Sequence, residues 1–417
     1  MDLEVIAVGT ELLRGHTIDT NTAELAATLG EVGISVARCT TVADDQSQIE
    51  STLKDALRRT GLVVLTGGLG PTPDDVTREA VAEVFGVELA VDEEHLERLK
   101  SWFADRSGRA MPHSNAKQCE VPLGAELLSN QQGSAPGIWM KGEDGIAILL
   151  PGVPHEMKHI LHAQVIPRLR DRLLTSDGYV AVSKSLTLRT TAVSESLLAD
   201  LLAGVESDIA PVTLSYLPTV FGVELCLTAL RMPPENAVQV LAAAESTLRE
   251  RIGKWVYGTG DDDLAAVLLD RLRDRGARLA VAESCTGGLV GARITSVPGS
   301  SDVFKGSLVA YDDSVKISQL GVAESSIREY GAVSEEVVLE MAEGVSRRLE
   351  TDAAIAVTGI AGPSGGSPEK PVGTVYLAAV LNGQTMTSRK IFPGEREWVR
   401  NRSAQDALAL LWELALR

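Results

Sequence analysis

The sequence predicts an α/β protein in which two doubly wound α/β domains flank a small α+β module. Strand and helix patterns alternate from residue 3 to about residue 170. Between about residues 179 and 253 the order becomes strand, helix, two strands and helix, and the alternation returns from Leu264 to the C-terminus. Alternating strands and helices indicate a mainly parallel sheet with helices on both faces. We therefore expect domains at residues 1–170, 171–254 and 255–417.

The first domain is defined by short apolar runs and by helical periodicity. Apolar runs predict buried strands at residues 3–8, 34–40, 62–66 and 147–150. Helices are predicted from Asp19, over residues 46–60 and from Thr77. Asn21 and Glu24 have the spacing of a capping box at the start of the first helix.

The module and the last domain are predicted in the same way. For the module we expect strands at residues 180–189, 212–218 and 222–230, and helices at residues 194–205 and 235–252. Residues 258–263 read as a solvated linker. For the last domain we expect strands at residues 278–282, 307–311, 353–357 and 373–380. Its expected helices are residues 264–275, 287–295, 334–349 and 397–416.

Composition excludes several classes of protein. No run reaches the roughly 20 apolar residues that span a bilayer, and no basic leader precedes an apolar stretch near Met1. The 4 cysteines have no paired spacing, so they predict reduced thiols in a cytoplasmic protein. The net charge of −18 and the lack of a basic run argue against direct nucleic-acid binding. Small anionic nucleotides remain possible substrates.

A candidate site follows the strand at residues 278–282. Residues 282–288 read Ala-Glu-Ser-Cys-Thr-Gly-Gly, where a strand turns into a helix. Ligands of open α/β sheets bind at such strand ends, and free amides at a helix start can stabilise an oxyanion. Ser284 would be the nucleophile. A structural helix cap explains the same residues without any chemistry, and Cys285 is a rival nucleophile.

The histidine positions restrict the choice of base. All 6 histidines lie at or before His162, so a Ser-His-Asp arrangement within the last domain is impossible. Lysine is the usual substitute. The last domain has four lysines: Lys305, Lys316, Lys370 and Lys390.

A second loop follows the strand at residues 353–357. Residues 357–363 read Val-Thr-Gly-Ile-Ala-Gly-Pro, which suits either a phosphate cradle or an ordinary turn. Arg396, Arg400 and Arg402 near the last helix are candidate phosphate ligands or solvated helix charges.

These motifs, together with residues 311–316, 331–334 and 370–375, resemble the CinA (competence/damage-inducible) family over essentially the whole chain. The resemblance implies that the C-terminal domain is a nicotinamide mononucleotide deamidase that needs no cofactor. It implies that Ser284 is the nucleophile, Lys316 its partner and Tyr311 their support. The substrate-binding residues that we expect are Thr286, Gly287, Gly288, Thr358, Gly359, Ala361, Gly362, Arg396 and Arg400.

The N-terminal domain carries a second constellation at its strand ends. It comprises Glu11, Asp19, Asn21, Gly67, Gly68, Gly70, Thr72, Asp74 and Asp75. Glycine amides suit a phosphate, and carboxylates suit a hard cation, although the same residues could simply cap a helix. The domain resembles molybdopterin-binding proteins such as MoaB. The family resemblance implies ADP-ribose pyrophosphatase activity with a divalent metal (Mg, Mn or Co) held by Asp74 and Asp75, and a monovalent cation as a further expected ligand.

Other functions remain open for this chain. The N-terminal domain could bind a pterin or a nucleotide without chemistry, in a protein that serves as a scaffold in competence or the DNA-damage response. The middle module resembles a KH fold but lacks a Gly-x-x-Gly loop, so we expect it to support structure or dimerisation in a homodimer. Residues 155–159 match the His-Glu-x-x-His zinc pattern, but they follow a motif of the resembled family, so we do not expect a zinc site.

Overall fold

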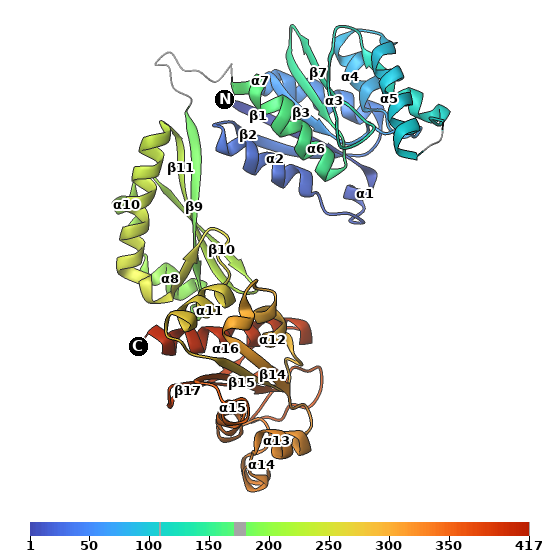
Figure 1. Ribbon diagram of the computed structural model, residues 1–417. Helices are drawn as coiled ribbons and strands as arrows, with labels where there is room; N and C mark the ends of the chain where they lie inside the picture. The colour runs from blue at the N-terminus through green and yellow to red at the C-terminus, as the bar shows by residue number, and fades with distance from the viewer. Residues whose placement is uncertain (108–109, 171–180, 417) are drawn as a thin grey trace. The chain divides into compact units, whose positions relative to one another are not determined.

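The computed structural model describes residues 1–107, 110–170 and 181–416 (Figure 1). The chain divides into two compact units. One comprises residues 1–184 with 229–239, and the other comprises residues 185–228 with 240–417. Within the described residues, no helix has the length and apolar character needed to cross a bilayer.

The first unit contains a six-stranded sheet in the order β2-β1-β3-β8-β7-β6. Its strands are β1 (Asp2–Val8), β2 (Ser35–Val42), β3 (Leu62–Thr66), β8 (Gly145–Leu150), β7 (Gly137–Gly142) and β6 (Glu126–Leu128). The first four are parallel, and β7 and β6 add an antiparallel edge. The parallel strands confirm the predicted ones, and the antiparallel pair was not predicted.

Helices cover both faces of this sheet because side chains alternate along each strand. Val5 packs with helices α2 (Thr20–Glu31) and α6 (Pro154–Ile160) on one face. Ile6 packs with α3 (Gln46–Thr60) and α4 (Thr77–Phe85) on the other. The remaining elements of the domain are α1 (Thr10–Leu13), β4 (Leu89–Val91), α5 (Glu93–Ser107), a 3-10 helix (His113–Cys119), β5 (Glu120–Pro122), a π-helical turn (Leu161–Val165) and α7 (Ile166–Arg170).

The predicted cap of α2 is wrong in one respect. The Asp19 carboxylate accepts from the Thr22 amide at 2.9 Å and is the cap. Asn21 lies inside the helix, and its side-chain amide donates instead to Thr66 and to the Gly152 carbonyl. Both residues suit an N-cap by composition, so only the fold could decide between them.

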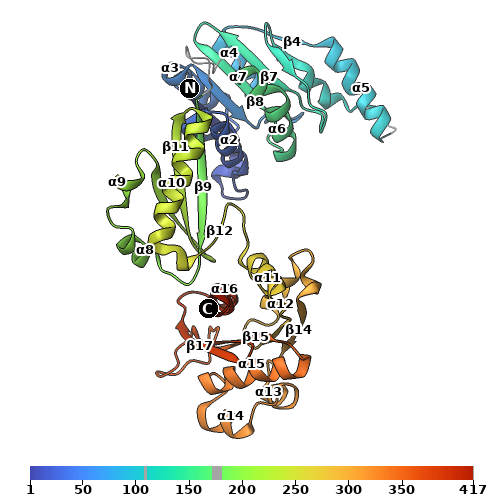
Figure 2. The ribbon, with the colours of Figure 1, turned by 60° about the vertical axis from the view of Figure 1, so that its left-hand side comes forward.

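The small sheet has the order β10-β11-β9-β12. Its elements are β9 (Val182–Thr190), α8 (Glu195–Leu201), α9 (Val205–Ile209), β10 (Thr213–Thr219), β11 (Gly222–Met232), α10 (Pro234–Ile252) and β12 (Val256–Thr259). Figure 2 shows α10 lying along this sheet. The predicted first residue of β9, Val180, lies outside the described residues.

Two predictions for this region are wrong. The helix expected at residues 194–205 is two helices, because Gly204 adopts a left-handed φ of 76° and the chain turns between them. Gly258 and Thr259, expected in a linker, belong to β12 and pair with β9. A four-residue strand that contains a glycine carries too little periodicity to be recognised in the sequence.

The last domain is built on a five-stranded sheet in the order β14-β13-β15-β16-β17. Its strands are β13 (Leu279–Glu283), β14 (Phe304–Val309), β15 (Ala353–Gly359), β16 (Thr374–Leu381) and β17 (Gln384–Ile391). The strands β14, β13 and β15 are parallel, whereas β16 and β17 form an antiparallel edge.

Both faces of this sheet are covered as well, which confirms the predicted layers. Val281 and Ile355 face α11 (Leu264–Asp274), α12 (Leu289–Thr295) and α16 (Arg396–Leu416). The alternate residues Ala280 and Ala354 face α15 (Glu335–Leu349). The strand β17 and the helices α13 (Asp313–Leu320) and α14 (Glu324–Tyr330) were not predicted.

Candidate active site

The parallel strands bring three predicted residues to one edge of the last sheet. Glu283, the last residue of β13, pairs with Val309 of β14 and with Val357 of β15. One residue further, the Ser284 amide donates to the Val357 carbonyl at 2.9 Å, and the Ala310 amide donates to the Glu283 carbonyl at 2.8 Å. Ser284, Tyr311 and Thr358 therefore lie at neighbouring strand ends, where α/β sheets bind ligands.

Ser284 begins a tight turn that leads into α12. Gly287 and Gly288 have φ values of 63° and 96°, which side chains other than glycine disfavour. The helix starts at Leu289, two residues later than predicted, because this left-handed pair comes first. The Ser284 side chain is buried at 8% exposure, and its hydroxyl has no hydrogen-bond partner among the described residues.

The backbone amides of the turn differ in whether they already donate a hydrogen bond to another residue. The Gly287 amide donates to the Ser284 carbonyl at 3.0 Å, and the Gly288 amide donates to the Glu283 carboxylate at 2.9 Å. The amides of Cys285 and Thr286 donate to no other residue in the described part of the chain. These two amides are therefore available for an oxyanion, whereas those of the two glycines are already occupied.

Lys316 lies on α13, which begins after the N-cap Asp312. Its side chain is only 2% exposed. The Lys316 Nζ donates to the Tyr311 carbonyl at 3.1 Å and to the Asp313 carboxylate at 3.1 Å. Among the described residues, it makes no hydrogen bond to Ser284. Catalytic hydrogen bonds are often long or poorly aligned before a substrate binds, so a paired role does not require this bond in the unliganded protein.

Two predicted arginines reach this edge from the first turns of α16. Arg396 donates to the Gly362 carbonyl at 2.8 Å and to the Tyr311 hydroxyl at 3.2 Å. Arg400 donates to the Thr286 carbonyl at 2.8 Å. Arg402 instead donates to the Val220 carbonyl and takes no part in this cluster.

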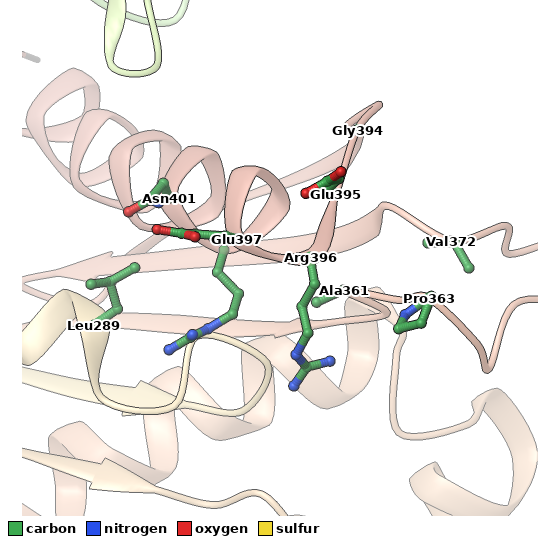
Figure 3. A pocket seen from close by; sticks show the side chains of 10 residues that line it. Leu289, Ala361, Pro363, Val372, Gly394, Glu395, Arg396, Glu397 and Asn401 are labelled. Atoms are coloured by element: carbon green, nitrogen blue, oxygen red, sulfur yellow. The ribbon is translucent and has the colours of Figure 1, made fainter. Parts of the chain in front are cut away.

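An open cavity of about 840 Å³ lies beside the arginines (Figure 3). Figure 3 shows the Arg396 side chain extending away from α16 past Ala361. The lining includes the predicted Ala361, Arg396 and Arg400, but not Ser284 or Lys316. The lining residues that the sequence reasoning missed are Leu289, Pro363, Val372, Gly394, Glu395, Glu397 and Asn401. Glu397 and Asn401 each follow one of the two arginines by one residue. Their i, i+4 spacing on the predicted helix could have indicated that they line the same cavity.

The second loop packs directly against the turn at Ser284. Thr358 is fully buried, and its hydroxyl donates to the Ala332 carbonyl at 2.8 Å. A β-carbon at Gly359 would lie 3.1 Å from the Cys285 sulfur and 2.9 Å from the Thr374 carbonyl oxygen. Glycine at this position lets the two loops touch.

Burial separates the two candidate nucleophiles. Desolvation raises the pKa of the Cys285 thiol to about 12, so it stays protonated near neutral pH. A thiol is a poor nucleophile compared with a thiolate, so burial argues against Cys285 as the nucleophile.

The predicted N-terminal residues form two groups. A small cavity of about 110 Å³ is lined by Glu11, Asp19, Asn21, Thr66 and neighbouring residues. The Asn21 side-chain oxygen is buried there and has no hydrogen-bond partner among the described residues. Such an orphaned acceptor is costly unless a ligand or water satisfies it.

The loop at residues 67–75 is the second group. Gly67 and Gly68 have φ values of 107° and 68°, and Thr77 donates to the Gly67 carbonyl at 2.9 Å. The Asp75 carboxylate accepts from the amide and the hydroxyl of Thr72, and thus closes the turn beside Gly70. The neighbouring Thr72 side chain, followed by the Asp74 backbone amide, lowers the pKa of the exposed Asp74 carboxyl.

The buried side chain of Arg78, which the sequence reasoning missed, is hydrogen-bonded to the same loop. Arg78 is 1% exposed and donates to the Leu69 and Gly70 carbonyls at 2.8 and 2.9 Å. Within residues 1–107, 110–170 and 181–416, no three His, Cys, Asp or Glu side chains are grouped to hold a metal ion. The Glu156 carboxylate of the His-Glu-x-x-His motif accepts from Asn130 at 2.5 Å.

Known proteins match this chain over nearly its whole length. The model of the CinA C-terminal domain matches residues 261–415, that of the probable molybdopterin binding domain matches residues 4–171, and that of the damage-inducible protein CinA KH domain matches residues 185–258. A CinA-like protein of Gemmatimonas aurantiaca is 46% identical over 98% of this chain and 95% of its own length. A CinA-like protein of Salinibacter ruber is 42% identical over 98% of both chains.

One solved structure is similar to part of this chain. The crystal structure of a competence-damaged protein (CinA) superfamily protein from Escherichia coli is 37% identical to this chain. It covers 36% of this chain and 88% of its own, with a TM-score of 0.36. The full-length relatives decide the identity, since they match from end to end: the chain belongs to the CinA family.

Proposed function

We propose that the C-terminal domain hydrolyses the carboxamide of nicotinamide mononucleotide, giving nicotinate mononucleotide and ammonia. The observation that carries this proposal is the meeting of three features at one sheet edge. These are a serine hydroxyl and two amides of the same turn that bond to no other described residue, together with a buried lysine anchored at the neighbouring strand end. Such an arrangement suits acyl transfer by a serine–lysine pair.

The contacts of Lys316 are compatible with a role as base. A neutral amine has two N–H donors, which suffice for the contacts to the Tyr311 carbonyl and to Asp313. Its lone pair is then free to take the Ser284 proton. The ionised form has a third N–H in place of that lone pair and cannot accept. We expect the neutral amine to be the active form.

The reaction then runs in two halves. The Ser284 oxygen attacks the carboxamide carbon, its proton passes to Lys316, and the amides of Cys285 and Thr286 hold the oxyanion. The C–N bond breaks, and ammonia leaves with the proton from Lys316. Water, losing a proton to Lys316, attacks the acyl-enzyme; the nicotinate carboxylate is released, and the Ser284 hydroxyl regains that proton.

The cavity beside the arginines suits the phosphate of the substrate. Arg400 has one N–H group in a hydrogen bond and Arg396 has two, so each keeps donors that can face the cavity. Guanidinium groups bind phosphate through paired hydrogen bonds. Recognition at the phosphate would place the carboxamide towards the turn at Ser284.

Ammonia release from nicotinamide mononucleotide tests the proposal. The wild type should release ammonia, and Ser284→Ala and Lys316→Ala should each abolish release. Matched controls are Ser325→Ala, at an exposed position of α14, and Lys305→Ala, at an exposed position of β14. These two should keep wild-type rates. Full activity in Ser284→Ala would refute the mechanism.

For the N-terminal domain we propose metal-dependent hydrolysis of the pyrophosphate of ADP-ribose. The orphaned Asn21 oxygen in a cavity with Glu11 and Asp19 supports a ligand at the strand ends. A magnesium ion commonly takes one or two carboxylates and completes its shell with substrate phosphate and water. Asp74, which is exposed, and Asp75 fit that requirement and would hold the ion, which would offset the phosphate charge.

AMP formation from ADP-ribose should require the metal and disappear in Asp75→Ala. If the domain only binds a pterin or a nucleotide, as the scaffold alternative holds, no AMP will form at any metal concentration. An Asp75→Ala variant that matches wild type would mean that the carboxylate only closes the turn.

A further inference from the structure

Glu283, the residue before the proposed nucleophile, has a fully buried carboxylate with 0% exposure. One carboxylate oxygen accepts from the amides of Gly288 and Val290 at 2.9 and 3.1 Å. The other accepts from the Gly291 amide at 2.9 Å and from the Ser307 hydroxyl at 3.0 Å. No lysine, arginine or histidine of the described residues forms an ion pair with it. Four hydrogen-bond donors thus hold a buried carboxylate.

This arrangement requires a reason because burying a charge without a cation is costly. Part of the cost is offset by the start of α12, whose unpaired amides and helix dipole favour a negative charge. The fit is also close. A β-carbon at Gly291 would lie 3.4 Å from the carboxylate and 3.0 Å from the Ser307 β-carbon, so glycine allows this helix to approach.

The contacts of Glu283 span the turn that contains Ser284. Before the turn, β13 is held in the sheet up to the Ser284 amide, which donates to the Val357 carbonyl. After the turn, the Glu283 side chain holds the amides of Gly288, Val290 and Gly291. The turn is therefore fixed at both ends, and only the amides of Cys285 and Thr286 within it donate to no other described residue.

We infer that Glu283 is a positioning residue. It occupies the amides at the start of α12 and thereby fixes the turn in which Ser284 and the amides of Cys285 and Thr286 face the same reacting group. Glu283 touches no substrate in this role. The expected effect of Glu283 on kcat rests on the proposed deamidase function. Its expected effect on the conformation of the turn is independent of that function.

Glutamine is an informative replacement because it is nearly the same size. Only one of its two terminal atoms accepts hydrogen bonds, and the other is an NH₂ donor. If the NH₂ group lies beside Ser307, that hydroxyl can rotate and accept, but the Gly291 amide then faces a donor. If it lies on the other side, the amides of Gly288 and Val290 both face a donor. The first orientation loses fewer hydrogen bonds and should dominate.

The test measures hydrogen exchange and steady-state kinetics on the full-length protein. In Glu283→Gln, amides of residues 284–291 should exchange faster, while peptides from the first unit remain unchanged. The kcat for ammonia release from nicotinamide mononucleotide should fall by about 10- to 100-fold, because small misplacements at a catalytic site cost that much. The KM should stay within about threefold, since the cavity at α16 is not altered.

Controls separate this role from a general loss of folding. Glu324→Gln, at an exposed ion pair with Arg328, should leave exchange and kcat unchanged. If Glu283→Gln does not fold, Ser307→Ala, which removes one of the four donors, should give the same changes to a smaller degree. Rates are expressed per correctly folded molecule, so partial unfolding cannot mimic a lower kcat.

The outcomes distinguish this inference from the function that it builds on. If wild type releases no ammonia, the deamidase proposal fails, and the exchange result still decides whether Glu283 holds the turn. Unchanged exchange at residues 284–291 in Glu283→Gln would overturn the inference. Wild-type kcat in that variant would overturn it as well.

Discussion

The Lys316 Nζ donates to the backbone carbonyl of Tyr311 at 3.1 Å, and not to the tyrosine hydroxyl. The hydroxyl lies on an exposed side chain (61%) and accepts from Arg396. The short helix α13 thus carries the buried Lys316, and a hydrogen bond to the backbone carbonyl of Tyr311 holds this side chain near the end of β14. The lysine and the tyrosine side chain can therefore be tested separately.

We predict that Tyr311→Phe leaves Lys316 in place and lowers kcat by no more than about tenfold, because it removes one hydrogen bond to a charged group. Lys316→Met should abolish turnover. The measurement is ammonia release under saturating substrate. Equal loss in both variants would instead place the tyrosine hydroxyl in the proton transfer.

Cys285 should be dispensable. Because burial raises its thiol pKa to about 12, roughly one molecule in 10,000 carries the thiolate at pH 8. Cys285→Ala should keep kcat within about threefold of wild type. Iodoacetamide at pH 8 should modify the exposed Cys39 well before Cys285, as peptide mass spectrometry would show. Loss of activity that tracks alkylation of Cys285 would contradict this.

Gly344→Ala should displace the helix that carries Lys316. A β-carbon at Gly344 of α15 would overlap the Leu320 carbonyl oxygen at the end of α13. We expect a loss of about 1–3 kcal/mol of stability from such overpacking, measured by urea unfolding, and a lower kcat. Gly30→Ala is the matched control, because it has open space in α2 and should be neutral or stabilising. Wild-type stability in Gly344→Ala would mean that α15 accommodates the methyl group.

Asp406 should destabilise the last domain at neutral pH. Burial raises its pKa above the usual 3.8, with Arg402 and Lys390 opposing the shift. The folded state then binds more protons than the unfolded state between the two pKa values. Stability therefore falls as the pH rises from about 3.8 through the folded pKa.

Asp406→Asn removes this charge and should raise the Tm by about 2–4 °C at pH 7, with a smaller gain at pH 4.5. Scanning calorimetry at both pH values checks the prediction. Asp270→Asn, at a side chain with 73% exposure, is the control and should shift neither value by as much. A lower Tm at pH 7 in Asp406→Asn would show that attraction to Arg402 outweighs the cost of burial.

Much of the fold was predictable because it depends on local patterns. The strand β3 and the helix α3 have the predicted bounds, and α4 begins at Thr77 as predicted. Long apolar runs and clear helical periodicity specify such elements before any tertiary contact forms. The choice of Ser284 and Lys316 also came from the sequence, through the histidine positions and the family resemblance.

The geometry of the candidate site depended on contacts between distant residues. Parallel pairing of β13 with β14 and β15 puts Ser284 beside the chain at Tyr311 and Thr358. In the sequence, Glu283 is one residue of the Ala-Glu-Ser motif and has no evident role. The packing of the domain shows that its carboxylate is buried against the start of α12. Sequence patterns report which residues form strands and helices, whereas sheet register and burial arise from the packing of the whole domain and decide which polar atoms meet and which stay unpaired.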